Sequence, residues 1–311
     1  MDDSNETAPS EFILLAFSNL HEWRFVVSGF MLTVYIFTLM GNSLIIFIFC
    51  LEASLQTPMY FFLGNLSLLD ICHTTTTIPQ IIVHLLSGRN NIAYGRCKTQ
   101  LFAFILFLGT ETILLAAMAY DRYVAICHPL RYTLIMNQKT CVQLVSMSWF
   151  TSSLNATVHT VFTFNLPLCG ANKINYFYCD IPPLLAISCG DISGIVTALL
   201  ATAPIIGFGP AFCVILSYIH IILRILKGHH SSGMKKAFST CTSHLLVVSL
   251  FYGSTIFTYV RPFSSYSLNK DRIVALLYSV LCPMLNPLIY TLRNKDVKGA
   301  LRKIRMKKLP F

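Results

Sequence analysis

Residues 26–50 read VVSGFMLTVYIFTLMGNSLIIFIFC, a stretch without a single Asp, Glu, Lys or Arg. A helix needs roughly 20 apolar residues to cross the hydrocarbon core of a bilayer, and this stretch is long enough to do so. Of the 311 residues, 55% are hydrophobic and 12% are charged, whereas a soluble domain usually devotes about a quarter of its residues to charge. The stretch therefore predicts a membrane-spanning helix near the start of the chain.

Six further apolar stretches follow, and the loops between them are too short for a separate soluble domain. They are residues 58–86, 99–120, 140–166, 192–223, 237–260 and 273–292. Asp70 and Glu111 are the only Asp, Glu, Lys or Arg residues in them. We predict an all-α membrane protein: an N-terminal segment over residues 1–25, a seven-transmembrane helix bundle over 26–292, and a tail over 293–311.

The positions of the basic residues predict how the bundle faces. With the N-terminus outside, most of the Lys and Arg residues fall in segments on the cytoplasmic side, chiefly 121–139, 224–236 and 293–311. Positive charge favours that side of a membrane, so we predict an outer N-terminus. The net charge of +10 then reflects membrane topology and not a nucleic-acid partner, because the basic residues sit between and after the apolar runs.

A sequon and four cysteines agree with this orientation. Asn5 begins an Asn-Glu-Thr glycosylation sequon on the segment placed outside. The outer cysteines are Cys97, Cys169, Cys179 and Cys189. Because the outside is oxidising, they can form two disulfides, and the residues alone leave three connectivities open.

Residues 118–132 read MAYDRYVAICHPLRY and lie at the inner end of the third predicted helix. Asp121-Arg122-Tyr123 resembles the ionic lock of rhodopsin-like receptors, and the full run resembles the vertebrate odorant receptors of the tetrapod class. Further matching segments are PMYFFL (58–63) with LSLLD (66–70), SY (217–218), KAFSTCTSH (236–244) and PMLNPLIY (283–290). Because the matches come in order in successive helices, the resemblance covers the chain from about residue 12 to its end.

The resemblance implies a plasma-membrane receptor, expected in the cilia of olfactory neurons. It would bind a small, mostly apolar volatile odorant and activate a stimulatory, olfactory-type G protein that raises cyclic AMP. It implies the disulfides Cys97–Cys179 and Cys169–Cys189. It implies no cofactor and no enzymatic activity.

The resemblance also implies an activation switch at the inner end of the bundle. At rest, Asp121 would hold Arg122 by a charge-assisted hydrogen bond. On activation, Arg122 would move toward Tyr218 and His244 and open a cleft for a G-protein helix. The full set of switch residues is Asp121, Arg122, Tyr123, Tyr218, His244, Asn286, Pro287 and Tyr290.

Two acids in the predicted spans form a candidate polar centre. An ionisable side chain inside a membrane is costly unless it is paired or hydrated, so Asp70 and Glu111 are functional candidates. The resemblance implies a hydrated centre that joins them to Asn42 and Asn286. A sodium ion at Asp70 and Glu111 is one expected occupant.

Counting back in helical steps from the matched positions predicts the wall of a ligand pocket. The residues are Phe104, Ile105, Leu108, Gly109, Thr112, Thr202, Ile205, Ile206, Phe251, Tyr252, Thr255, Tyr259, Leu276 and Ser279. This wall is mostly apolar with a few hydroxyls, which suits a small neutral molecule with one oxygen function. Tyr259 and Thr255 are the expected polar contacts, because a buried hydroxyl needs a partner.

Other classes of ligand and other functions agree less well with the sequence. An amine receptor would want an acid where Phe104 stands, and a retinal-binding opsin needs a Lys that the seventh span lacks. A carboxylate ligand stays open, because Arg261, Lys270 and Arg272 lie near the outer mouth. A receptor for a non-odorant molecule outside the nose is the alternative. A membrane enzyme or a transporter is a remoter one, because neither metal-ligand spacing nor internal repeats are visible.

The tail over residues 293–311 is basic, with Val297, Leu301 and Ile304 on one helical face. An amphipathic helix of this kind lies on a membrane surface, with Lys and Arg toward anionic lipid headgroups. We therefore predict a short cytoplasmic helix that contacts membrane lipids.

Overall fold

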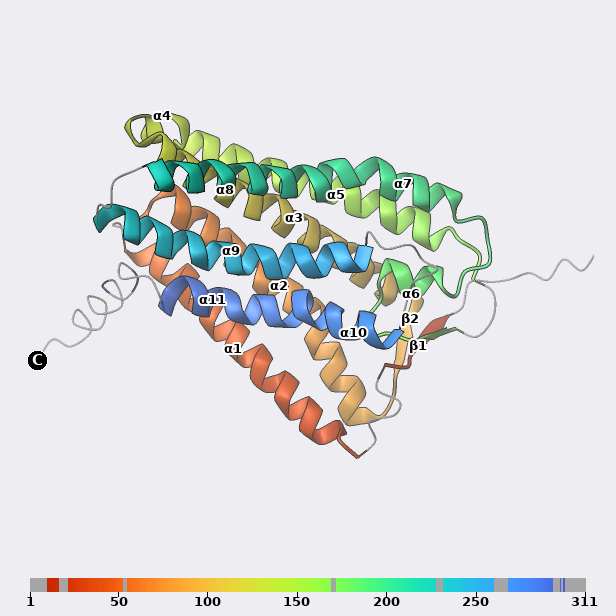
Figure 1. The fold of residues 1–311 in the computed structure, drawn as a ribbon. Coiled ribbons are helices and arrows are strands. Elements are labelled where there is room, and N and C mark those ends of the chain that lie inside the picture. Colours follow the sequence, from red (N-terminus) through yellow and green to blue (C-terminus); the bar gives the residue numbers. More distant parts are fainter. Residues whose placement is uncertain are drawn as a thin grey trace, which may run out of the picture.

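The computed structural model describes residues 10–16, 22–52, 55–168, 172–227, 232–259 and 268–292, together with 297 and 299. In this part of the chain, seven long helical segments run alongside one another (Figure 1). They are α1 (Arg24–Leu51), α2 (Pro58–Ser87), α3 (Tyr94–Cys127), α5 (Gln138–Phe164), α7 (Ser193–Ala203) with η3 (Pro204–Phe208) and α8 (Gly209–Lys227), α9 (Ser232–Tyr259), and α10 (Leu268–Leu276) with η5 (Leu277–Leu281) and α11 (Cys282–Leu292). Each predicted span coincides with one of these segments, which confirms the seven-helix bundle.

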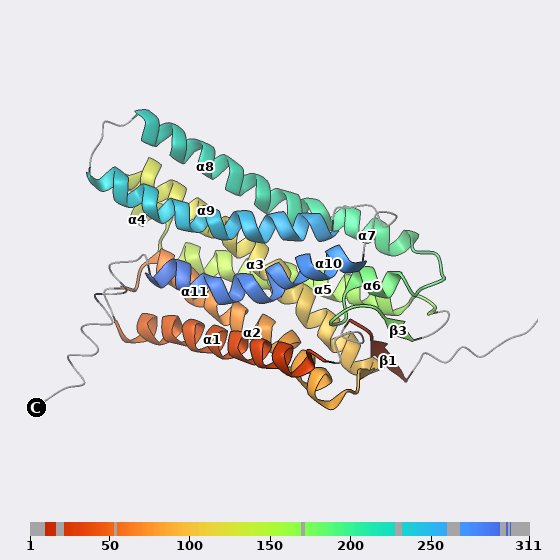
Figure 2. The same ribbon diagram turned by 60° about the horizontal axis from the view of Figure 1, so that its bottom comes forward.

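The helix α3 lies at the centre of the bundle, where it packs against α2, α5, α8 and α9. Figure 2 shows α1 at one side of the molecule and α8 at the opposite side. The short elements η2 (Pro129–Arg131) and α4 (Tyr132–Ile135) follow α3, and α6 (Ile181–Leu185) lies between α5 and α7. A residue on α3 can therefore reach most of the other helices.

Apolar side chains face outward and polar ones inward. On α1, Phe30, Phe37 and Met40 are 63%, 62% and 67% exposed. Asn42 and Asp70, in contrast, are fully buried. Water would make such a surface costly, whereas lipid tails solvate it, so the burial pattern is that of a bundle in a bilayer.

Length and hydropathy differ among the helices. Within the described residues, four stretches are long and apolar enough to cross a membrane: Arg24–Leu51, Tyr94–Cys127, Ser193–Lys227 and Asp271–Tyr290. A shorter apolar run, His244–Tyr259, belongs to α9. The helices α2 and α5 are long too, but buried hydroxyls make them less apolar. Those hydroxyls bond to their own helix: Thr74 donates to the Asp70 carbonyl at 2.7 Å and Ser148 to the Leu144 carbonyl at 2.7 Å.

A small sheet closes one end of the bundle, and the sequence did not predict it. Strand β1 (Glu11–Leu14) pairs antiparallel with β2 (Asn91–Ala93) and parallel with β3 (Lys173–Ile174), so the order is β2-β1-β3. Phe12 is fully buried and stacks on Tyr94 with ring centroids 5.9 Å apart. The N-terminal segment is thus attached to the loop that follows α5.

Two π-helical turns accompany prolines. A proline lacks the amide hydrogen that a helix needs, and a wider turn is one way to accommodate the loss. Segment η3 begins at Pro204, and η5 ends just before the turn of α11 that contains Pro283. The helices α2 and α11, in contrast, continue through Pro79 and Pro287.

Some predicted features fall on residues outside the described ranges. These are Asn5, Cys169, Arg261 and the tail, of which Val297 and Gly299 alone are described, both as helical. For Lys270 the backbone is described and the side chain is not. Their predicted roles stay predictions.

Candidate functional site

A cavity of about 270 Å³ lies among α3, α5, the segment from α7 to η3, and α9. It is lined by Ile105, Leu108, Gly109, Thr112, Asn155, His159, Ile181, Leu199, Leu200, Thr202, Ala203, Ile206, Gly207, Phe208, Tyr252, Thr255, Ile256 and Tyr259. Most of these side chains are apolar. The cavity therefore suits a small molecule with few polar groups.

Nine of the fourteen predicted wall residues line this cavity: Ile105, Leu108, Gly109, Thr112, Thr202, Ile206, Tyr252, Thr255 and Tyr259. The structure does not place the other five around it: Phe104, Ile205, Phe251, Leu276 and Ser279. Whether the nine contact a ligand stays a prediction.

Three of the five misplaced residues, Ile205, Leu276 and Ser279, lie within or next to the π-helical turns. Helical counting assumes 3.6 residues per turn, and a π turn changes the direction in which every residue beyond it points. The count back from Tyr218 crosses η3, and Ile205 is 60% exposed on the outside of the bundle. The count back from Pro287 crosses η5, so Leu276 and Ser279 turn away from the cavity; Ser279 donates to the Ala275 carbonyl at 2.6 Å.

Phe104 and Phe251 are packing residues. Phe104 is fully buried, with ring centroids 4.9 Å from His73 and 4.7 Å from Tyr178. Phe251 is also fully buried, and its ring lies edge-on to Tyr252 at 5.7 Å. Both side chains pack against neighbouring aromatic rings and do not line the cavity.

Sequence reasoning missed the contribution of α5, because the pocket was counted from the third, fifth, sixth and seventh helices only. Asn155 and His159 line the cavity from α5. His159 Nε2 lies 2.9 Å from the Thr202 hydroxyl of α7. Two polar residues four apart on one apolar helix are the signal that could have revealed this face.

The two hydroxyls expected to seek a ligand already have protein partners. Tyr259 donates to the Asp180 carboxylate, with 3.0 Å to each oxygen. Thr255 donates to the Phe251 carbonyl at 2.9 Å. Both residues still line the cavity, but the reason given for their polar role is wrong.

A loop covers the outer end of the cavity, described here as residues 172–192. The disulfide Cys97–Cys179 ties it to α3, and the Cys179 amide donates to Gln100 Oε1 at 3.0 Å. The disulfide predicted for this pair is present. Cys189 is also disulfide-bonded, but its predicted partner Cys169 lies outside the described residues.

Asp180 joins this loop to α9. It is fully buried and accepts hydrogen bonds from the Ile181 amide at 2.8 Å and from Tyr259. Burial raises the pKa of the Asp180 carboxyl to about 7, although both hydrogen bonds act to lower it. The loop is therefore held over the cavity by a carboxyl group that can change charge near neutral pH.

Arg272 holds the same loop from α10. Its Nε and Nη2 donate to the Asn175 carbonyl at 3.1 and 3.0 Å. Because its guanidinium group is already hydrogen-bonded to the loop, Arg272 is a less favourable partner for a ligand carboxylate.

At the opposite end of the bundle, several predicted switch residues gather around Arg122. Arg122 is only 6% exposed, and the Tyr218 hydroxyl lies 2.7 Å from His244 Nδ1. The His244 ring lies 6.5 Å from that of Tyr290. These residues come from α3, α8, α9 and α11, so the tertiary structure joins four helices here.

The expected pairing of Asp121 with Arg122 is corrected. Asp121 Oδ1 accepts a hydrogen bond from the Tyr132 hydroxyl of α4 at 2.8 Å. Within the described residues no ion pair joins Asp121 to Arg122, and Arg122 Nε has no hydrogen-bond partner. Adjacent residues on a helix point about 100° apart, so Tyr132, across the turn after α3, reaches the carboxylate instead.

The predicted polar centre is present in part. Asn286 Nδ2 donates to both Asp70 oxygens at 3.1 and 3.0 Å. Asn42 bonds instead to the Pro283 carbonyl at 3.1 Å, and Glu111 lies 3.8 Å from His73. Both Glu111 oxygens and the Oδ1 atoms of Asn42 and Asn286 have no hydrogen-bond partner among the described residues. Such oxygens fit a small cation or water, so sodium stays a prediction.

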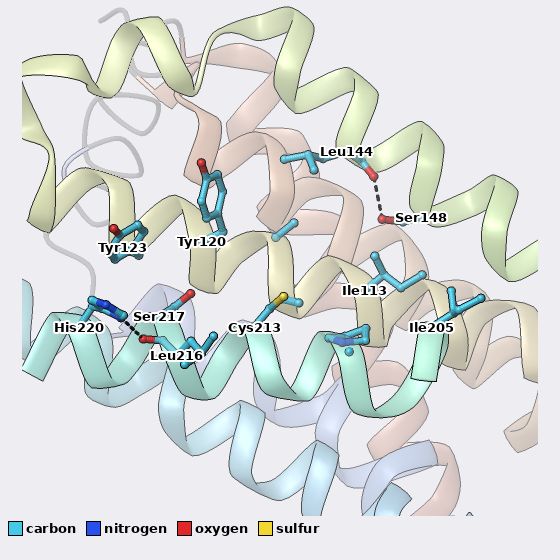
Figure 3. A pocket seen from close by; sticks show the side chains of 14 residues that line it. Ile113, Tyr120, Tyr123, Leu144, Ser148, Ile205, Cys213, Leu216, Ser217 and His220 are labelled. Carbon is cyan, nitrogen blue, oxygen red and sulfur yellow. Dashed lines mark hydrogen bonds between the residues drawn. The ribbon is translucent and has the colours of Figure 1, made fainter. Parts of the chain in front are cut away.

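A second hollow of about 610 Å³ lies between α3, α5 and α8 (Figure 3). It is lined by Ile113, Ala116, Ala117, Tyr120, Tyr123, Leu144, Ser148, Ile205, Gly209, Pro210, Cys213, Leu216, Ser217 and His220. Ile205 and Leu216 are 60% and 39% exposed. The hollow therefore opens on the surface of the bundle.

Comparison with known proteins agrees with this geometry. The chain matches the olfactory receptor family over residues 31–308. It is 45% identical to mouse olfactory receptor 5AP2 over 98% of this chain and 96% of that one. It is likewise 45% identical to human olfactory receptor 10C1 over 99% of both chains.

Among solved structures, squid rhodopsin superposes with a TM-score of 0.68 at 16% identity, covering 91% of this chain and 85% of that one. That likeness supports the fold alone. The family match confirms the family predicted from residues 118–132. The chain therefore belongs to the olfactory receptors, G-protein-coupled receptors of the plasma membrane that sense odorants and are not enzymes.

Proposed function

We propose that the 270 Å³ cavity binds a small, mostly apolar volatile odorant, and that binding activates a stimulatory G protein and raises cyclic AMP. The observation that carries this proposal is the cavity beneath the Asp180–Tyr259 contact. Ligand pockets for drug-sized molecules typically reach about 300–1,000 Å³. A cavity at the lower limit favours a ligand of volatile size.

The helix α9 offers a route from the cavity to the inner end. Near the cavity, the Tyr252 hydroxyl donates to the Thr112 carbonyl of α3 at 2.7 Å. Two turns earlier on α9, His244 contacts Tyr218 beside Arg122. A ligand that favours one position of α9 over another would shift the switch by its difference in affinity for the two states.

A cyclic-AMP reporter screen of a few hundred volatile compounds tests this proposal, and Ile206→Trp tests the cavity. Ile206 lines it, so a Trp there should fill part of the space and weaken the best agonist by about fivefold or more, since overpacking typically costs about 1–3 kcal/mol. Ile205→Trp is the matched control, because the adjacent Ile205 is 60% exposed outside the cavity.

Surface staining must show equal amounts of both variants. Equal loss of potency in the two, or none in either, would place the ligand elsewhere. If no volatile compound raises cyclic AMP in cells that display the receptor, the proposed ligand class or the coupling is wrong.

The agonist response should depend on external pH through Asp180. Because its folded-state pKa is raised from 3.8 to about 7, burial of the neutral acid stabilises the closed loop at low pH. This contribution is lost as the pH rises through about 7. A neutral agonist should therefore be several-fold more potent at about pH 6 than at about pH 8, measured as its half-maximal concentration.

Asp180→Asn is the control for this prediction. Asparagine is neutral at both pH values and keeps an oxygen for the Tyr259 hydroxyl, so its response should not change with pH. A direct activator of adenylyl cyclase corrects for effects of pH on the reporter. The same pH dependence in wild type and variant would exclude Asp180 as its source.

A further inference from the structure

The polar side of the cavity is formed by three residues, Asn155 and His159 of α5 and Thr202 of α7, here called the α5–α7 wall. Asn155 and His159 are four residues apart, so their side chains are neighbours on one helical face. They are 8% and 2% exposed, respectively. The wall is the part of the cavity whose hydrogen bonds are incomplete.

The hydrogen bonds of Thr202 indicate the tautomer of His159. The single Thr202 hydroxyl hydrogen is directed to the Ala198 carbonyl at 2.9 Å. The Thr202 oxygen is then free to accept from His159 Nε2–H at 2.9 Å. The opposite arrangement would leave a buried N–H of His159 without an acceptor, which is the rarer and costlier defect. His159 Nδ1 is therefore a lone-pair acceptor, assigned from the network.

That acceptor has no partner. Among the described residues, His159 Nδ1 and Asn155 Oδ1 are buried without a hydrogen bond. The Asn155 carboxamide also offers N–H donors. A buried polar atom left unpaired costs more than a typical hydrogen bond contributes, so a ligand that supplies the missing partner gains affinity here.

We propose, resting on the function proposed above, that the α5–α7 wall is a hydroxyl-recognition subsite and that the preferred odorants are neutral alcohols or phenols. The ligand hydroxyl donates to His159 Nδ1 and its oxygen accepts from the Asn155 amide. A ketone, ester or ether can accept from Asn155 but has no hydrogen for His159.

Charged ligands fit this wall less well. Asp180 is not among the described residues that line the cavity, so an ammonium group would find no carboxylate in that lining. None of the described residues that line the cavity is Lys or Arg, so an ionised carboxylate would find no cation among them. An uncharged hydroxyl matches both the donor and the acceptor of the wall.

The experiment uses alcohols of increasing chain length, each with its methyl ether and its ketone or aldehyde, in the cyclic-AMP reporter. In wild type, the best alcohol should be about tenfold more potent than its ether, the effect of one net hydrogen bond. His159→Leu removes the acceptor and keeps an apolar side chain, so the alcohol-to-ether ratio should fall to about one. The potency of the ether should stay within about twofold.

Thr157→Val is the matched control. Thr157 lies between Asn155 and His159 in sequence but is exposed on the other face of α5, where it donates to the Ser153 carbonyl at 2.8 Å. The Thr157→Val substitution removes one hydroxyl from the same helix and should leave the ratio of alcohol potency to ether potency unchanged. If His159→Leu does not reach the surface, Asn155→Leu tests the same wall and should lower the ratio as well.

The outcomes separate the subsite from the receptor function. If wild type responds to volatile compounds but ethers match alcohols, or if the variants lower all potencies equally, the subsite is overturned and the proposed function stands. If wild type at the surface responds to no compound of the larger screen, the proposed function itself fails.

Discussion

Arg122→Ala is expected to abolish the cyclic-AMP response to any agonist while the receptor still reaches the plasma membrane. Arg122 is buried at the inner end of α3, beside the Tyr218–His244 pair, and its Nε has no partner among the described residues. It is also the residue that the family motif assigns to the switch. Alanine removes the guanidinium of this cluster, so α8 and α9 lose the group around which they would rearrange.

Reporter response and surface staining in the same cells measure this effect. Arg224→Ala is the matched control, because Arg224 is an exposed arginine in the last turn of α8. The control should respond at near wild-type level. A normal response from Arg122→Ala, at equal surface amount, would remove Arg122 from the switch.

Replacement of both Cys97 and Cys179 by Ala is expected to cause a near-complete loss of receptor at the cell surface. The disulfide joins residues 82 positions apart, and both cysteines are fully buried. Loss of a native disulfide typically costs about 2–5 kcal/mol. Here it would also free the loop that carries Asp180 and Ile181 over the cavity, so the outer closure and the fold should fail together.

Surface staining and thermal unfolding in detergent measure this loss. The double variant leaves no unpaired thiol from this bond, so misplaced disulfides do not confuse the result. Cys50→Ala serves as control, because Cys50 is a free, exposed cysteine on α1. Equal surface amounts and equal melting temperatures for wild type, the double variant and Cys50→Ala would show that the Cys97–Cys179 disulfide is dispensable.

The polar centre illustrates how far sequence reasoning reaches. That Asp70 must find a partner follows from its place in an apolar helix, and Asn286 supplies one. That Asn42 instead bonds to the Pro283 carbonyl does not follow from the sequence. The two asparagines have the same side chain, so their positions and orientations in the bundle decide which one reaches Asp70, and hydropathy carries no such information.

The run over residues 26–50 and its six successors determined by themselves that the chain is a membrane bundle, because the need to bury backbone polar groups in lipid is met helix by helix. Residues 118–132 likewise determined the family. Only the tertiary structure decided that Ile206 and not Ile205 faces the cavity, since the two are adjacent in the π turn η3 and their side chains point in different directions. The tertiary structure alone brings Asn155, His159 and Thr202 together, and it alone pairs the Tyr259 hydroxyl with the Asp180 carboxyl group. These contacts join distant helices and a folded loop, so the sequence pattern does not reveal them.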